Sequence, residues 1–293
     1  MNEFSVAYLM QKQSLPLEAK ILYTGRRIQQ FNDAFEDMTY VSFSGGLDST
    51  VLLDIVRRIY PRTPAVFVDT GLEYPEIRDF VKTVPDVEWV KPKLSFRQIL
   101  DKYGYPVVSK EQASFIQEYR DTKSDGLKKT RLEGNAWGRG KISEKWKFLL
   151  GAPFQISDKC CDYMKKEPAK RYEKETGRVP FVGTRADEST QRTQDYTRYG
   201  CNSFETKRPF SRPLSIWTHD DVWQYIRSRG LAYSKIYDMG YDRTGCAFCG
   251  FGCHLNTPNK FQIMAKTHPA LHRYCMETLG FQEVFDYMKV PTI

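Results

Sequence analysis

The chain lacks the long apolar run that a membrane-spanning helix requires. None of its hydrophobic stretches approaches the ~20 residues that cross a bilayer. The N-terminal MNEFSVAYLMQKQSLPLEAK has neither the basic start nor the apolar stretch of a secretory signal. Internal repeats and low-complexity tracts are also missing. These absences predict a globular cytoplasmic protein with no membrane partner, and either a monomer or an oligomer fits the sequence.

The cysteines do not form an even, regularly spaced set. Seven are present, and an odd number in a reducing compartment argues against a disulfide framework. Cys160 and Cys161 are adjacent, while Cys246, Cys249 and Cys253 form C-x-x-C-x-x-x-C. Grouped cysteines in a cytosolic chain indicate metal or redox chemistry. Cys201 and Cys275 are isolated, and lone cysteines are more often small core residues than catalysts.

A phosphate-binding loop is present, but it lacks the lysine of a Walker loop. SFSGGLDST (42–50) has no Gly-Lys-Ser/Thr ending, which disfavours ordinary γ-phosphate chemistry. Its glycines let the backbone turn tightly, and its N–H groups and the hydroxyls of Ser44 and Ser49 can bind phosphate. An acid beside phosphates needs a cation, so Asp48 predicts Mg²⁺ at this loop.

Apolar runs alternate with helical patterns over the first half of the chain. Strands are expected at 39–43, 64–69, 87–92 and 179–185, and helices at 15–37, 50–60, 74–84, 161–176 and after Thr218, a plausible N-cap. This alternation predicts an α/β, Rossmann-like parallel sheet with helices on both faces. Ligands bind at the carboxyl ends of such strands, where SGGLDS and Asp69-Thr70-Gly71 fall.

The pattern changes within a basic segment. Residues 123–147 hold eight Lys/Arg against three Asp/Glu, with Trp137 and Trp146 between them. Together with the net charge of +8, this suits a surface that follows a nucleic-acid backbone and stacks on bases. A solvated insertion is the alternative. The expected organisation is an N-terminal helical segment (1–38), a nucleotide-binding domain (39–239) with a basic insertion at about 121–150, and a cysteine-rich C-terminal segment (240–293).

Several motifs resemble those of known families. SGGLDS resembles the SGGxDS signature of the PP-loop ATP pyrophosphatase superfamily, whose fold is adenine nucleotide alpha hydrolase-like. VSFSGGLDSTVLL, VFVDTG and GTRADEST-Q-R together resemble the phosphoadenosine phosphosulfate (PAPS) reductase family. The resemblance implies that Asp69 and Gly71 flank the nucleotide and that Arg185 and Arg192 hold anionic groups. It implies a phosphate cradle made of Ser42, Ser44, Gly45, Gly46, Leu47, Asp48 and Ser49.

The cysteine pattern is similar to that of adenylyl-sulfate (APS) reductases, which carry a 4Fe–4S cluster. In CCDYMKKEP, Lys165 stands where that family places a lysine. The implied cluster ligands are Cys160, Cys161, Cys246 and Cys249, with Cys253 as a possible substitute. Adjacent cysteines chelate one Zn²⁺ poorly but can bind separate irons of a cubane. Zinc held by Cys246, Cys249, Cys253 and His254 stays an alternative.

One motif of the APS and PAPS reductases is missing. Their Glu-Cys-Gly-Leu-His tail has no counterpart in FQEVFDYMKVPTI. We therefore expect an enzyme that splits ATP to AMP and pyrophosphate and adenylates an acceptor for sulfur transfer. The expected acceptor is nucleic acid, tRNA or DNA, and the sulfur donor a protein such as a cysteine desulfurase. The alternatives are an assimilatory reductase that converts APS or PAPS to sulfite, and a non-enzymatic nucleotide or nucleic-acid binding protein.

Overall fold

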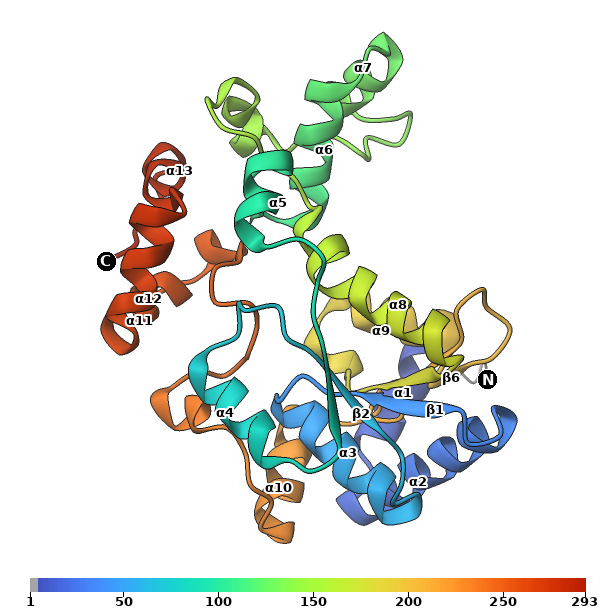
Figure 1. Cartoon of the computed structure of the whole chain (residues 1–293). Coiled ribbons are helices and arrows are strands. Elements are labelled where there is room, and N and C mark those ends of the chain that lie inside the picture. The colour runs from blue at the N-terminus through green and yellow to red at the C-terminus, as the bar shows by residue number, and fades with distance from the viewer. Residues whose placement is uncertain (1–4) are drawn as a thin grey trace. The chain divides into compact units, whose positions relative to one another are not determined.

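The structure is a computed structural model of the chain and describes residues 5–293. The first four residues of the expected N-terminal helical segment lie outside the described residues. The chain forms two compact units (Figure 1). The first unit comprises Met1–Lys91 and Pro168–Thr244, and the second comprises Pro92–Glu167 and Gly245–Ile293. The domain boundaries expected from the sequence stay a prediction.

The first unit is built on a six-stranded sheet with the order β3-β2-β1-β5-β7-β6. All neighbouring pairs are parallel except β6 with β7, which is antiparallel. The strands are β1 (Thr39–Ser42), β2 (Ala65–Val68), β3 (Val87–Val90), β5 (Val179–Val182), β6 (Asn202–Ser203) and β7 (Phe210–Ser211). The expected parallel α/β architecture is confirmed.

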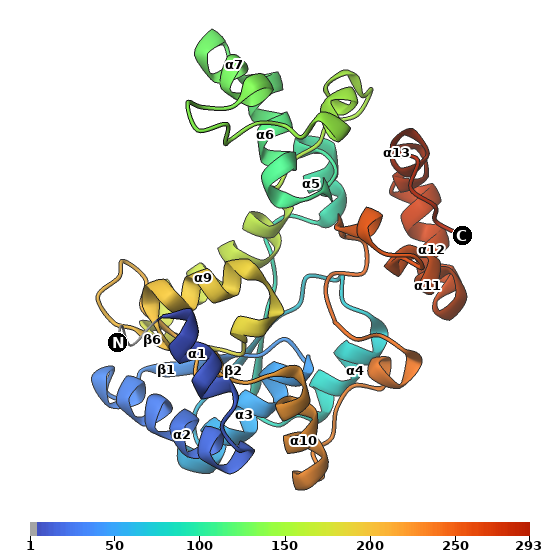
Figure 2. The ribbon, with the colours of Figure 1, turned by 180° about the vertical axis from the view of Figure 1, so that it is seen from behind.

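Helices cover both faces of this sheet. The helices of the first unit are α1 (Val6–Gln13), α2 (Leu17–Ala34), α3 (Leu47–Ile59), α4 (Pro75–Thr83), α8 (Glu167–Thr176), α9 (Thr190–Tyr199) and α10 (His219–Arg229). On one face α3 contacts β1 and β5, and α2 and α10 pack beside it (Figure 1). On the other face Tyr172 of α8 lies edge-on to Tyr40 of β1, with ring centroids 5.0 Å apart. The reverse view shows α1 and α9 (Figure 2).

The strand order places a switch point between β1 and β5. The chain runs from β1 outward to β2 and β3, and then returns to the other side of β1 as β5. Loops that leave β1 and β5 therefore diverge at neighbouring carboxyl ends, which opens a crevice there in sheets of this kind. SGGLDS follows β1 and GTRADEST follows β5. The fold thus brings the two motifs together.

The second unit is mainly helical. Its helical elements are α5 (Phe96–Tyr103), α6 (Lys110–Asp121), α7 (Asp125–Glu133), the 3-10 segments η1 (Glu144–Gly151) and η5 (Cys253–Leu255), the π-turns η2 (Asp162–Lys166) and η6 (Tyr274–Thr278), and α11 (Lys260–Thr267), α12 (Pro269–Arg273) and α13 (Phe281–Met288). A short parallel pair joins β4 (Val107–Val108) to β8 (Gly250–Phe251). Buried phenylalanines form its core, among them Phe261, Phe281 and Phe285.

Some elements differ from the expectation. The helix expected at 161–176 begins with the π-turn η2 before α8, and α5, α9 and four short strands were not foreseen. A two-residue strand is too short to show an alternation of apolar and polar residues. It forms because of the strand that it pairs with rather than because of its own sequence. No helix among residues 5–293 is long and apolar enough to cross a membrane.

Candidate functional site

The loop after β1 is shaped to receive an anion. Gly45 has a φ of +72°, and a Cβ there would lie 2.8 Å from Val81, so only glycine fits. Gly46 is the N-cap of α3 without a side-chain cap, which leaves first-turn N–H groups of α3 directed out of the helix. The exposed Ser44 hydroxyl lies 3.1 Å from the buried Ser49 hydroxyl, which donates to the Gly46 carbonyl at 2.9 Å. The Ser44 hydroxyl and the first-turn N–H groups could bind phosphate, and the cradle as a whole stays a prediction.

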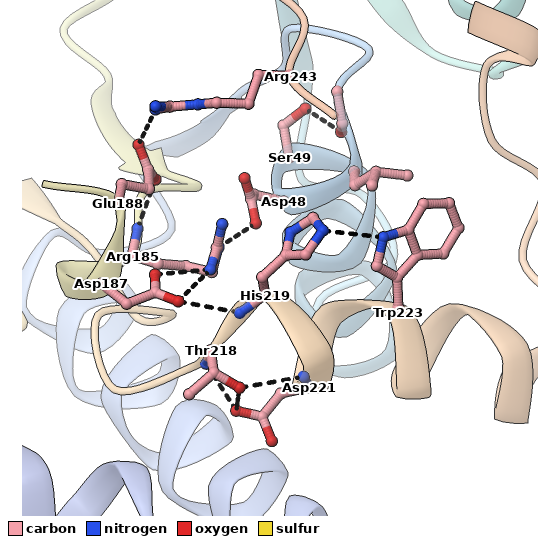
Figure 3. A network of polar contacts seen from close by, with 12 residues as sticks. Asp48, Ser49, Arg185, Asp187, Glu188, Thr218, His219, Asp221, Trp223 and Arg243 are labelled. Carbon is pink, nitrogen blue, oxygen red and sulfur yellow. Dashed lines mark hydrogen bonds and ion pairs between the residues drawn. The ribbon is translucent and has the colours of Figure 1, made fainter. Parts of the chain in front are cut away.

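Asp48, in the first turn of α3, is joined to the loop that follows β5. Arg185 Nε donates to an Asp48 carboxylate oxygen at 2.6 Å, and Arg185 Nη1 donates to both oxygens of Asp187 at 2.6 Å (Figure 3). A Cβ on Gly183 would lie 3.0 Å from the Asp48 backbone. A glycine at this position therefore lets the two loops approach closely enough for the ion pair to form.

The electrostatics of Asp48 reflect its burial. Desolvation raises the pKa of the Asp48 carboxyl above its usual value, and the Arg185 guanidinium opposes that rise, while the nearby carboxylates of Glu188 and Asp187 add to it. The second carboxylate oxygen of Asp48 accepts no hydrogen bond from the residues that the structure describes. A partly buried carboxylate with one oxygen available fits a cation such as Mg²⁺, which would stabilise its charged form.

The N-terminus of α10 completes this network. Thr218 caps α10 in a capping box with Asp221, so the expected N-cap is confirmed. Asp221 also pairs with Lys20 of α2 at 2.6 Å, and that lysine is only 2% exposed. This anchored helix start lets the His219 N–H donate to Asp187 at 3.0 Å, and Trp223 Nε1 donates to His219 Nε2 at 3.1 Å (Figure 3). The second bond leaves Nδ1 as the protonated nitrogen of a neutral His219 ring.

Three further contacts lie near the loop after β1. Leu47 is the first helical residue of α3, and its N–H donates to the Tyr237 hydroxyl at 3.1 Å. The same hydroxyl lies 3.2 Å from the Thr244 hydroxyl. Arg243, which is largely exposed, pairs with Glu188 at 3.5 Å. Tyr237 therefore occupies an N–H group of the kind that an incoming phosphate would use.

The other residues predicted for nucleotide binding lie in the same unit. Asp69 is buried after β2, accepts the Gly71 N–H at 3.3 Å and pairs with Arg78 at 3.0 Å. Gly71 has a φ of +72°. Arg192 is in the first turn of α9, and among residues 5–293 its guanidinium forms no hydrogen bond or ion pair. Arg192 is thus available to an anion, whereas Arg185 is already paired with carboxylates.

In the second unit, three of the predicted thiols lie within electrostatic reach of a fourth, that of Cys160. Cys160 is buried, and its pKa is raised first by burial and then by the thiols of Cys246, Cys161 and Cys249. The nearby Lys165 ammonium acts in the opposite direction. Thiols are the donors that iron–sulfur clusters use, yet among the described residues no three His, Cys, Asp or Glu side chains are grouped to hold a metal ion. The four cluster ligands therefore stay a prediction.

The alternative zinc ligands are arranged differently. Cys253 is buried with its pKa raised to about 11, by burial first and against the pull of Lys260, and the thiol of Cys249 is near it. The His254 ring lies edge-on to Trp146 at 4.7 Å between centroids. The lack of a metal-binding group among the described residues applies to this zinc set as well.

The two isolated cysteines are core residues. Cys275 is fully buried within η6, and burial raises the pKa of its thiol. Cys201 is buried in the first unit, with its sulfur 3.8 Å from the Tyr23 hydroxyl. A protonated thiol without solvent access is a poor nucleophile.

Sequence reasoning missed several residues of the network. Asp187, Glu188, His219, Tyr237 and Arg243 were not singled out. The acids directly after Arg185 were a usable signal, because a buried arginine needs carboxylate partners. His219 and Tyr237 gave no local signal, since α10 and the segment after it reach the site only through the fold.

The chain belongs to the phosphoadenosine phosphosulfate reductase domain family, whose profile matches residues 38–140 and 133–250. This confirms the resemblance and places the chain in a family of enzymes. Adenosine 5'-phosphosulfate reductase 2 of Bacillus subtilis is 27% identical over 213 residues, 70% of each chain. Among solved structures, a PAPS reductase from Candida auris in a phosphate complex shows 18% identity and a TM-score of 0.45, covering 83% of this chain and 95% of that one. The U34-tRNA thiolase NcsA from Methanococcus maripaludis with its [4Fe-4S] cluster shows 14% identity and a TM-score of 0.41, covering 92% and 80%.

Proposed function

We propose that this protein binds ATP at the loop after β1, splits it to AMP and pyrophosphate, and adenylates a nucleic acid for sulfur transfer. The observation that carries the proposal is Asp48, a partly buried carboxylate held by Arg185 at the N-terminus of α3. A carboxylate among phosphate-binding donors is favourable only with a cation, and ATP is the nucleotide that arrives with Mg²⁺. APS, which has no pyrophosphate group, has less need of such a carboxylate.

The residues of the first unit then take distinct roles. The amides of SGGLDS and the hydroxyls of Ser44 and Ser49 bind the β,γ-pyrophosphate, and Asp48 holds the Mg²⁺ that neutralises it. Arg185 orients Asp48, because its guanidinium is bound to Asp48 and Asp187. Arg192 is the cation available for an anionic substrate group. Asp69 and Gly71 flank the nucleotide, as the family resemblance implies.

The reaction forms one bond to phosphorus and breaks another. An oxygen of the acceptor attacks the α-phosphorus, the α–β anhydride bond breaks, and pyrophosphate leaves. A sulfur nucleophile from a donor such as a cysteine desulfurase then displaces AMP from the acceptor. In the second unit, Cys160, Cys161, Cys246 and Cys249 would hold a 4Fe–4S cluster, which supplies a redox-active centre that can bind sulfur. Lys165 lies near Cys160.

The test is AMP formation by protein purified without oxygen. α-Labelled ATP is incubated with Mg²⁺ and either tRNA or DNA, and AMP and pyrophosphate are measured. Asp48→Ala should reduce AMP formation about 100-fold or more, the order lost when one electrostatic contact to a reacting group is removed. Asp79→Ala is the matched control in the same unit, because Asp79 is 69% exposed and pairs with Lys82 on the helix surface.

A second function is favoured by family membership and by the Bacillus subtilis relative. That function is reduction of APS or PAPS to sulfite. Release of sulfite from APS in the presence of thioredoxin, with no AMP from ATP under any acceptor, would overturn the ATP proposal in favour of the reductase. Nucleotide binding without turnover of either compound would favour the non-enzymatic alternative.

A further inference from the structure

The basic segment of the second unit contains a loop with a defined conformation. It follows α7 (Figure 1) and comprises residues 134–140, GNAWGRG. The Asn135 side-chain oxygen accepts the N–H groups of Trp137 and Arg139, both at 3.0 Å, and the Asn135 N–H donates to the Arg139 carbonyl at 2.8 Å. Gly134 has a φ of +99°, and a Cβ there would lie 2.8 Å from the backbone of Gly138. The turn is therefore closed by its own hydrogen bonds.

Arg131 fastens this loop to the helices beneath it. Its Nη1 donates to the Gly140 carbonyl at 2.6 Å, its Nε donates to Glu118 at 2.7 Å, and its guanidinium lies 4.2 Å from the ring centroid of Phe115. Its carbonyl accepts the Ile142 N–H at 2.8 Å. Of the eight cations in this segment, Arg131 thus serves the structure of the loop and is not available to a ligand.

The two tryptophans of the segment have opposite environments. Trp146 is 6% exposed and packs against His254, whereas Trp137 is 81% exposed at the tip of the loop. Arg139 and Lys141, on the same loop and just after it, are exposed, and within residues 5–293 their side chains form no hydrogen bond or ion pair. An indole held in water on an ordered loop costs solvation free energy that a bound partner would recover.

We propose that Trp137 stacks on an unpaired base of a single-stranded nucleic-acid segment, while Arg139 and Lys141 contact its phosphates. This inference rests on the proposed function, because the single-stranded nucleic acid is taken to be the acceptor that is adenylated. Residues 134–143 contain no acid, so the charge of the loop complements a polyanion. Stacking needs the face of a base, which a duplex hides. Because the loop is already ordered, little conformational entropy is lost when the strand binds.

The test measures binding in the absence of nucleotide, with fluorescein-labelled rU15, dT15 and a duplex DNA of equal length. Trp137→Ala should weaken single-strand binding about tenfold, and Trp137→Phe should restore most of it. Leu22→Ala is the matched control, since Leu22 is an apolar residue 68% exposed in the first unit. Arg139→Ser and Lys141→Ser should each make the negative slope of log affinity against log salt shallower by about 0.7. Tighter binding of rU15 than dT15 supports the proposal with RNA as the source, and the reverse supports it with DNA.

Three outcomes would overturn the inference. The first is that neither single strand binds. The second is that Trp137→Ala binds the single strands with the same affinity as wild type. The third is that Trp137→Ala loses as much affinity for the duplex as it loses for the single strands. Thermal unfolding of the variants checks that the fold is kept. The inference and the proposed function fail separately. Binding that depends on Trp137, without AMP formation, would contradict the catalytic proposal alone. AMP formation with an acceptor that Trp137→Ala binds as tightly as wild type would contradict the stacking role of Trp137 alone.

Discussion

Arg185 Nε lies 2.6 Å from the carboxylate of Asp48, and this ion pair joins the loops that follow β1 and β5. The Arg185 side chain is 8% exposed and also pairs with Asp187. Two partly buried carboxylates thus share one guanidinium at the switch point of the sheet. The pair holds Asp48 in place and keeps its charge tolerable where solvent is scarce.

Replacing Arg185 should destabilise the first unit. Arg185→Ala leaves Asp48 and Asp187 without their common cation, and the free energy of unfolding in urea should fall by about 3 kcal/mol. The double variant with Asp48→Ala should lose less than the sum of the single losses, because the repulsive carboxylate is gone. Arg58→Ala, at an exposed pair with Asp54, should change stability by less than about 1 kcal/mol. Strictly additive losses would contradict this coupling.

Removing the Tyr237 hydroxyl should increase nucleotide affinity. That hydroxyl accepts the Leu47 N–H at the N-terminus of α3, so it competes with a phosphate oxygen for one donor. Tyr237→Phe should tighten binding of a non-hydrolysable ATP analogue several-fold, up to about tenfold, the effect of about one net hydrogen bond. Calorimetric titration measures this. Tyr233→Phe, whose hydroxyl bonds to Asp238, is the control, and weaker binding by Tyr237→Phe would show that the hydroxyl instead contacts the ligand.

Single serine substitutions should separate the two metal assignments. If a 4Fe–4S cluster is bound as proposed, Cys160→Ser, Cys161→Ser, Cys246→Ser and Cys249→Ser should each lower the iron content and the visible absorbance of protein prepared without oxygen. Cys275→Ser, at a fully buried position, should retain both. Zinc would give a different pattern: His254→Ala would release the metal, Cys160→Ser and Cys161→Ser would not, and Cys246→Ser and Cys249→Ser would lower the metal content under either assignment. Stoichiometric zinc without iron would therefore refute the cluster.

Stability at alkaline pH should depend on Tyr172. Burial first, and then the Glu88 carboxylate, raise the pKa of Tyr172 from 10.0 to about 12. A pKa raised in the folded state means that this stabilising contribution is present below pH ~10 and is lost as the pH rises towards 12. The unfolding free energy of Tyr172→Phe should therefore fall less steeply over this window than that of wild type. Tyr274→Phe, at a tyrosine 47% exposed, should follow the wild-type slope, and identical slopes for all three proteins would contradict the assignment.

Local sequence was sufficient for the strand, loop and helix that carry the predicted phosphate site. An apolar run, two glycines and an amphipathic helix within 39–59 act on neighbouring residues, so their pattern is legible without the fold. The same holds for the Thr218 cap of α10, whereas the grouping of the cysteines into one site stays a prediction. Family membership then followed from these short motifs.

Only the tertiary structure decided which side chains meet. From the sequence, the two tryptophans and eight cations of residues 123–147 could not be distinguished as ligand-binding candidates. In the structure, Trp146 is buried against His254, and the Arg131 guanidinium is bound to Glu118 and to the Gly140 carbonyl. Likewise, nothing near Asp48 in the sequence indicated that Arg185 would be its partner. Such contacts depend on strand order and helix packing across long stretches of chain. The sequence by itself determined the chemistry that is available, and the fold decided where each group is exposed, buried or paired.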